Sequence, residues 1–180
     1  MKALGIKHSV LTAKHGCGFL LWNTSTTLPD GTPYGYAVQR PNGLPSYPRD
    51  VIQEYVDTMR REGLGYGFYY STGNNFYLNR RGFVPDLPKT LPGQVNVTDA
   101  QFESLVIQHV TELWTQYGEL VEIWFDGGFG EAFQSVMKTL LAKHQAQAVA
   151  FQGYGVSSNP TRWVGTESGL PSYPLWSTIG

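Results

Sequence analysis

Cysteine is nearly absent from this sequence of 180 residues, because Cys17 is its only example. A single thiol excludes an internal disulfide, a zinc site built on several cysteines and a redox pair of cysteines. The sequence also lacks any apolar run of the about 18 residues that a membrane span needs. Its first residues, MKALG, lack the long apolar core of a signal peptide. We therefore expect neither a membrane span nor a targeting signal in this stretch.

Charge is also scarce. Charged residues make up 15% of the chain, the formal net charge is -1, and no segment gathers Lys and Arg into the stripe that nucleic acid phosphates require. Nucleic acid is therefore not an expected partner. Aromatic residues reach 14%, which is typical of a large core and of sites that stack rings on weakly charged ligands such as sugars. Ordinary packing explains the same composition, so composition leaves the ligand class open.

Strand-like and helix-like patterns alternate along the chain. Strand-like runs occupy residues 6–13, 64–71, 120–126 and 148–153, and helical spacing occupies residues 49–62, 98–117 and 131–144. Thr98 and Gln101 form a capping-box pattern at the start of the second helix. Two long segments rich in turn residues, 23–48 and 72–97, are expected to be irregular. This order predicts a parallel α/β fold, either an open doubly wound sheet or a closed (β/α)8 barrel.

Chemistry-bearing residues follow the predicted strands, whereas glycine fingerprints for dinucleotides or phosphates do not. His15, Tyr69 and Asp126 stand at three strand ends, and an irregular segment follows Gly153 after the fourth. Active sites of (β/α)8 barrels are assembled from such C-terminal strand ends. Four strands make half a barrel. We therefore expect residues 1–180 to be one part of a (β/α)8 domain, incomplete at both ends.

The alternation of side chains along the third predicted strand indicates which face of the sheet carries Asp126. It places Glu122, Trp124 and Asp126 on one face of the strand and the apolar Val121, Ile123 and Phe125 on the other. Helices would cover the apolar face, which leaves Trp124 and Asp126 directed toward the barrel axis. Taken alone, the sequence Asp126-Gly127 is equally typical of a turn at a strand end, so both interpretations stay open.

Glu167 is the second candidate carboxylate. Acids on predicted helices are explained by a solvated face, namely Glu54, Asp57, Glu62, Glu103 and Glu112. Glu167 instead lies in a loop after a strand, with Trp163 and Trp176 nearby, although an acid at the surface is the plain alternative. Two carboxyl groups from different strand ends, one ionised and one kept protonated, are the groups that break a glycosidic bond.

Histidines and serines offer no competing chemistry. His15 precedes two glycines at a strand end and can reach a ligand, whereas His8 begins the same strand and is expected near the structural surface. No His-Glu-x-x-His spacing and no Gly-x-Ser-x-Gly elbow occurs. We expect neither a metal nor another cofactor.

Four segments together resemble the α-L-fucosidases of glycoside hydrolase family 29. They span nearly the whole chain and read, in order, VLTAKHGCGFLLW, DVIQEYVDTMRREGLGYGFYYS, YGELVEIWFDGG and RWVGTESG. The resemblance implies a retaining exo-enzyme on a (β/α)8 domain. One departure is His15-Gly16, where many members have two adjacent histidines, so one contact to a sugar hydroxyl is absent or made by another group.

The resemblance also implies roles for individual residues. Asp126 is similar to the nucleophile that forms a covalent glycosyl-enzyme, and Glu167 to the general acid/base. His15, Tyr69 and Trp124 resemble residues that contact fucose.

Trp22, which closes the first matching segment, is counted with the substrate-binding residues. The RWVG-x-E-x-G setting of Glu167 resembles the plant-like subgroup that prefers α-1,3/1,4-linked fucose. The implied partner is a fucosylated oligosaccharide or glycoprotein glycan, and the implied location is extracellular or a secretory or lysosomal-type compartment. An inactive fragment and a non-catalytic carbohydrate-binding relative remain the alternatives, and the oligomeric state is not predicted.

Overall fold

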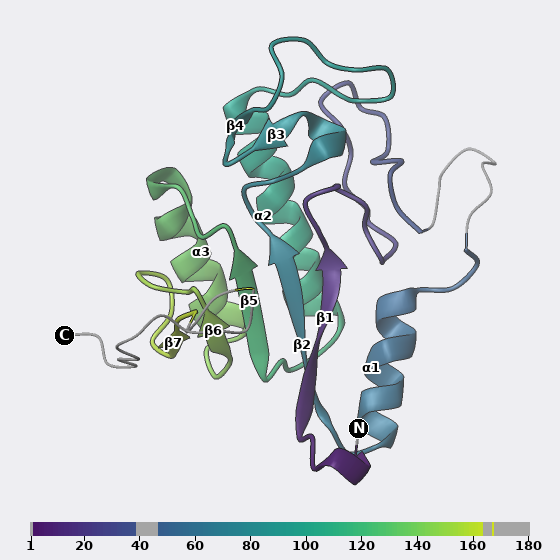
Figure 1. Cartoon of the computed structure of the whole chain (residues 1–180), viewed down its shortest axis with the longest axis vertical. Helices are drawn as coiled ribbons and strands as arrows, with labels where there is room; N and C mark the ends of the chain where they lie inside the picture. The colour runs from purple at the N-terminus through teal and green to yellow at the C-terminus, as the bar shows by residue number, and fades with distance from the viewer. Residues whose placement is uncertain (1, 39–46, 164–166, 168–180) are drawn as a thin grey trace.

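The computed structural model describes residues 2–38, 47–163 and 167. Short 3-10 turns lie at Lys2–Leu4 (η1) and Phe76–Leu78 (η2). The helices are α1 (Val51–Arg61), α2 (Asp99–Gln116) and α3 (Glu131–His144). The strands are β1 (His8–Lys14), β2 (Gly65–Ser71), β3 (Arg80–Arg81), β4 (Val84–Pro85), β5 (Glu122–Asp126), β6 (Val149–Phe151) and β7 (Pro160–Thr161). Figure 1 shows the central strands side by side with their arrowheads toward the same end of the molecule.

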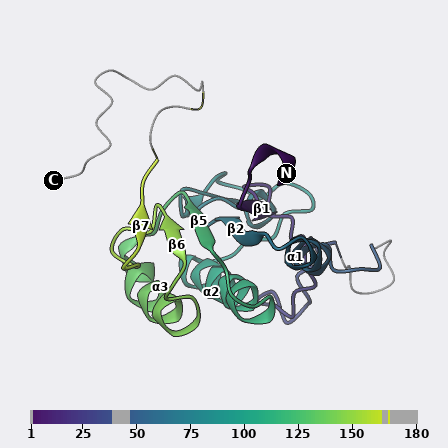
Figure 2. The ribbon, with the colours of Figure 1, turned by 90° about the horizontal axis from the view of Figure 1, so that it is seen from below.

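The main sheet has the order β1-β2-β5-β6-β7, and all four strand pairs are parallel. Viewed along the strands, α2 and α3 lie on one face of this row, and α1 lies beyond β2 on the same side (Figure 2). The predicted parallel α/β architecture is therefore confirmed for the described residues. Strand C-terminal ends meet at one edge of the sheet, where a site can be assembled.

Alternation in β5 and β2 explains how the sheet divides its faces. Ile123 and Phe125 are buried on the helix side, whereas Trp124 and Asp126 are only half-buried on the other side, as the alternation predicted. In β2 the ring of Phe68 packs against Tyr55 of α1, with ring centroids 6.5 Å apart. Large rings thus fill the layer between sheet and helices and anchor the strands that carry the site.

Helix ends follow the predicted capping chemistry. The Thr98 side chain accepts a hydrogen bond from the Gln101 backbone N–H, and the Gln101 side chain accepts one from the Thr98 backbone N–H, which confirms the capping box. Asp50 caps α1 through the Gln53 N–H at 2.9 Å. Gly63, with φ +64°, lets the chain leave that helix in a left-handed conformation.

Several boundaries differ from the sequence prediction. β1 extends from His8 to Lys14 rather than from residue 6 to 13, and β6 keeps only Val149–Phe151. The segment 72–97, expected to be irregular, contains η2 and the antiparallel pair β3 and β4, and β7 was not predicted at all. Strands of two residues show no periodicity, so only their partners reveal them. Among the described residues, no helix is long and apolar enough to cross a membrane.

Candidate active site

The C-terminal ends of β1, β2 and β5 bring four of the predicted site residues together. β2 lies between the other two strands, and the register places Tyr69 opposite Trp124 and Ser71 opposite Asp126. His15 follows directly after the last residue of β1. Residues more than 100 positions apart in the sequence therefore share one edge of the sheet.

Tyr69 is the centre of this group. Its hydroxyl donates a hydrogen bond to Asp126 Oδ2. Its ring lies parallel to the His15 imidazole, with centroids 5.6 Å apart and planes inclined by 8°, and meets the Trp124 indole edge-on at 5.3 Å. The Tyr69 phenol thus holds one carboxylate oxygen of Asp126. The rings of His15, Tyr69 and Trp124 form a continuous aromatic surface beside it.

The Tyr69 hydroxyl stays protonated at physiological pH. Burial raises its pKa most, and the hydrogen bond to Asp126 and the charge of that carboxylate raise it further. The charge of Glu167 acts in the same direction. Both candidate carboxylates thus act on the same phenol, which remains a donor to Asp126.

Trp124 continues the aromatic surface toward the far strands. Its ring lies 4.5 Å from Phe151 and 5.9 Å from Trp163, measured between centroids. Its indole Nε1 is buried and meets no acceptor among the described residues. Buried donors are usually hydrogen-bonded, so this N–H is available to a polar group that enters the site.

The backbone around Asp126 is fixed by Thr72, which the sequence analysis did not identify. The Thr72 N–H and hydroxyl both point to the Asp126 carbonyl oxygen at 2.9 Å, and the hydroxyl also lies 2.5 Å from the Gly128 carbonyl oxygen. Gly127 and Gly128 have φ +90° and +67°. These values favour glycine and explain why two glycines follow the carboxylate.

Lys14 is a second residue that the sequence analysis missed. Its side chain is 1% exposed and donates to the carbonyl oxygens of Ser71 and Asn74. Burial lowers its pKa to about 7, and the charges of Cys17 and Asp126 oppose that shift. The sequence did contain a signal for Lys14, because a lysine stands at a buried strand end directly before His15.

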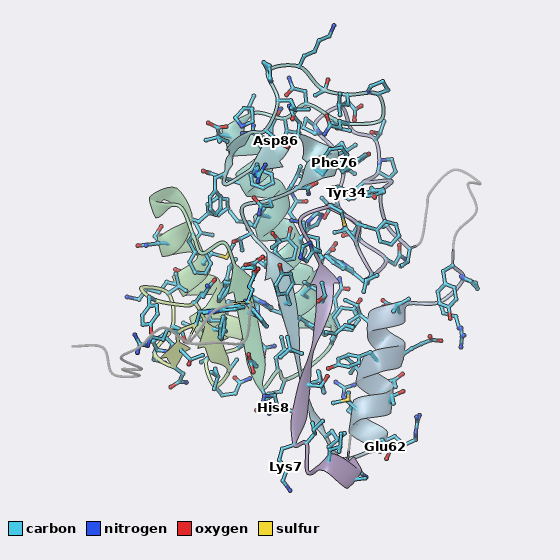
Figure 3. All side chains as sticks on the ribbon, in the orientation of Figure 1. Lys7, His8, Tyr34, Glu62, Phe76 and Asp86 are labelled. Atoms are coloured by element: carbon cyan, nitrogen blue, oxygen red, sulfur yellow. The ribbon has the colours of Figure 1, made fainter. Side chains whose placement is uncertain are left out.

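Glu167, Trp22 and His8 lie outside this cluster of rings. Glu167 is exposed. Trp22 is completely buried, and its Nε1 donates to Glu112 at 2.8 Å. No surface of Trp22 is left for a sugar, so the interpretation of Trp22 as a substrate-binding residue is wrong in this structure. His8 is exposed, 3.1 Å from Glu122, at the end of the molecule opposite Phe76 and Asp86 (Figure 3).

Glu112 corrects a second expectation. A solvated helix face was predicted for it, but the side chain is 8% exposed and accepts four hydrogen bonds. The donors are Trp22 Nε1, Thr24 Oγ1, Ser25 N and Ser25 Oγ. The carboxylate thus joins α2 to the chain that follows β1, a packing role that helical spacing alone does not show.

Open space adjoins the cluster on the His15 side. A pocket of about 350 Å³ is lined by His15, Cys17, Phe76 and Arg81, among others. A pocket of similar volume, about 370 Å³, lies between α3 and residues 155–158, which follow β6. Within the described part of the chain, no three His, Cys, Asp or Glu side chains are grouped as metal ligands would be.

A parallel sheet that delivers a carboxylate, a phenol donor and an aromatic surface to its strand C-terminal ends has the architecture of glycoside hydrolases built on (β/α) domains. Comparison with known proteins narrows this class. The family model described as Alpha-L-fucosidase matches residues 1–164. The chain belongs to the α-L-fucosidase family.

Relatives agree with this assignment. Alpha-L-fucosidase 1 of Arabidopsis thaliana is 30% identical over 185 residues, which cover 98% of this chain and 31% of that protein. A proposed α-L-fucosidase from Bacteroides thetaiotaomicron has a crystal structure with TM-score 0.70 and 28% identity, covering 99% of this chain and 39% of that one. The Lactobacillus casei α-L-fucosidase AlfC in complex with α-L-fucose shares the fold, with TM-score 0.63 and 22% identity over 83% of this chain and 47% of that one. The chain spans about a third of the length of the Arabidopsis protein.

Proposed function

We propose that this chain carries the catalytic carboxylates of a retaining exo-α-L-fucosidase that removes terminal α-linked L-fucose from glycans. The observation that supports it best is the hydrogen bond from Tyr69 to Asp126 within an aromatic surface at the strand C-terminal ends. The complex of AlfC with α-L-fucose is a fact about that protein. It supports fucose as the sugar to test here.

In the first step, Asp126 acts as the nucleophile. Tyr69 engages Oδ2, so Oδ1 is the oxygen that attacks the anomeric carbon. The bond from that carbon to the departing oxygen breaks, and Glu167, as a carboxylic acid, gives its proton to that oxygen. The products are a fucosyl ester of Asp126, the released alcohol and an ionised Glu167.

In the second step, Glu167 takes a proton from water. The water oxygen attacks the anomeric carbon, the ester bond to Asp126 breaks, and fucose leaves with its original anomeric configuration. Retention requires the two carboxyl groups to stand about 5 to 5.5 Å apart.

Contacts with the sugar follow from the residues around Asp126. The rings of Tyr69 and Trp124 suit the apolar face and the C5 methyl of fucose. Trp124 Nε1, buried without an acceptor among the described residues, and the exposed His15 suit its hydroxyls. Preference for α-1,3/1,4 linkages and a secretory, lysosomal-type or extracellular location are proposed from the family resemblance alone.

Replacement of Asp126 by Gly tests the nucleophile. In the full protein, we expect hydrolysis of an aryl α-L-fucoside to fall roughly 10⁴-fold, as when other catalytic side chains are removed. Sodium azide should restore turnover, because the small anion fits the space left by the carboxylate and attacks in its place. The product would be fucosyl azide, detected by NMR. Hydrolysis at the wild-type rate would exclude Asp126 as nucleophile.

Replacement of Glu167 by Ala tests the acid/base. General acid catalysis contributes roughly 10²- to 10⁴-fold, and poor leaving groups need it most. We expect a large loss of kcat/KM on a fucosylated oligosaccharide and a much smaller loss on a 2,4-dinitrophenyl fucoside. Equal losses on both substrates would reject the assignment. Such equal losses would favour a binding role for Glu167. A full-length wild type that hydrolyses neither substrate would favour the non-catalytic alternative.

A further inference from the structure

Lys14 is the one buried lysine near the candidate nucleophile, and the mechanism above does not use it. The structure assigns it a positioning role: we propose that the Lys14 ammonium group clamps the turn after β2 and thereby holds Asp126 in place for attack. The inference rests on the proposed function, because it concerns the carboxylate that we assign as nucleophile. It adds a residue whose action reaches the substrate only through Asp126.

The clamp is visible in the hydrogen bonds. Lys14 ends β1, and its Nζ donates to the carbonyl oxygens of Ser71 and Asn74, which begin and continue the turn after β2. Thr72 lies between these two acceptors and holds the Asp126 carbonyl oxygen. A side chain on one strand thus fixes the turn that supports the carboxylate on another strand.

The surroundings of Lys14 make its charge effective. The ammonium lies 4.8 Å from the centroid of the Tyr70 ring, in a cation–π arrangement. The side chain is almost completely buried, and in such a medium opposite charges attract more strongly than in water. The ammonium therefore holds the Ser71 and Asn74 carbonyl oxygens by charge-assisted hydrogen bonds, which are stronger than those of a neutral donor.

Other titratable groups around Lys14 do not replace its effect. His109 of α2 is buried, and burial, with the Lys14 charge second, lowers the pKa of its imidazole to about 3. Burial raises the pKa of the Tyr70 hydroxyl well above its usual range. Both groups are therefore neutral between pH 5 and 7. Cys17, in the turn after β1, is exposed, and Asp126 remains the charged partner from β5.

The pH dependence has a definite sign. The pKa of Lys14 is lowered to about 7, so its charge is present below that pH and declines above it. Above that pH, the neutral amine of Lys14 holds the turn after β2 less strongly. Lys14→Met should therefore lose activity most at low pH and approach the wild type above pH 7, apart from a constant loss due to the missing hydrogen bonds.

Three variants of the full protein separate the effect of the Lys14 charge from the effect of its hydrogen bonds. Lys14→Met removes both, Lys14→Gln keeps a donor without charge, and Lys14→Arg keeps the charge. We expect kcat/KM for an aryl fucoside to fall most below pH 7 in the first two variants, and the pH profile of the wild type to be kept in Lys14→Arg. The exposed Lys89→Met serves as the matched control. A uniform loss at every pH would reduce Lys14 to a structural tether and overturn the inference.

The NMR signal of Asp126 makes the test independent of activity. The carboxyl ¹³C resonance, assigned by its loss in Asp126→Asn, reports the surroundings of this carboxylate in the wild type and in Lys14→Gln. A shifted or broadened Asp126 resonance in Lys14→Gln at pH 6 supports the inference, even if the wild type hydrolyses no fucoside and the proposed function fails. An unchanged Asp126 resonance overturns the inference, whatever the activity. Should Lys14→Met not fold, Lys14→Gln and Lys14→Arg carry the comparison.

Discussion

Tyr69 combines two tasks in one side chain. Its hydroxyl orients Asp126 by a hydrogen bond, and its ring joins His15 to Trp124. A hydrogen bond to the charged form of a carboxyl group stabilises that form. The phenol therefore acts on the nucleophile from the β2 side, while Lys14 acts on it through the turn after β2.

Replacement of Tyr69 by Phe separates these tasks. The ring stays, the hydrogen bond to Asp126 is lost, and we expect kcat/KM to fall roughly 10- to 100-fold, the effect of about 1.4 to 2.7 kcal/mol. Steady-state kinetics on an aryl fucoside measure this loss. Tyr154→Phe, at an exposed tyrosine, is the control, and equal kcat/KM in the two variants would contradict the argument.

At the scale of elements, α2 is held to the chain after β1 by a buried carboxylate. Glu112 accepts from one indole, one backbone N–H and two hydroxyls, so each of its oxygens has two donors. The fixed chain continues to Tyr34, whose hydroxyl donates to the Gly18 carbonyl oxygen at 2.7 Å. Packing on the helix side thereby supports the turn that follows His15.

Replacement of Glu112 by Gln tests this link. An amide turns one acceptor oxygen into a donor group, which faces existing donors and leaves buried partners unsatisfied. We expect a loss of about 1 to 3 kcal/mol in the free energy of unfolding, measured by denaturant titration. The exposed Glu119→Gln should leave it nearly unchanged. Equal stability of the two variants would show that the four hydrogen bonds contribute little.

Capping boxes and alternation were predictable at this scale because they depend on residues close in sequence. Thr98 with Gln101 and the faces of β5 are examples that the structure confirms. The burial of Glu112 was not predictable in this way. Its donors lie nearly 90 positions earlier, and no local pattern reports a contact over that separation.

At the scale of the whole molecule, the helices cover one face of the sheet (Figure 2). The other face exposes apolar side chains, among them Val149 at 43% and Trp163 at 40%. The Arabidopsis relative is about three times as long as this chain. Apolar surface of this kind is a site of association, and in longer family members further chain is available to cover it.

Residues 1–180 produced alone should therefore self-associate. We expect a mass above that of the monomer in light scattering at micromolar concentration, and enhanced fluorescence of a hydrophobic dye. Val149→Lys, on the open face, should weaken both signals because it places a charge where association would bury it. Lys89→Met should not weaken them. A sharp monomeric species without dye binding would contradict the expectation.

Sequence alone determined the order of strands and helices, the direction of Asp126 along β5 and the membership suggested by the four segments, since each depends on local spacing or residue identity. Tertiary structure decided which strand ends meet, that Tyr69 holds Asp126, that Trp22 and Glu112 are buried together, and that Lys14 holds the turn after β2. Strand order and long-range packing set these contacts. They join residues whose separation in the sequence carries no signal of their distance in space.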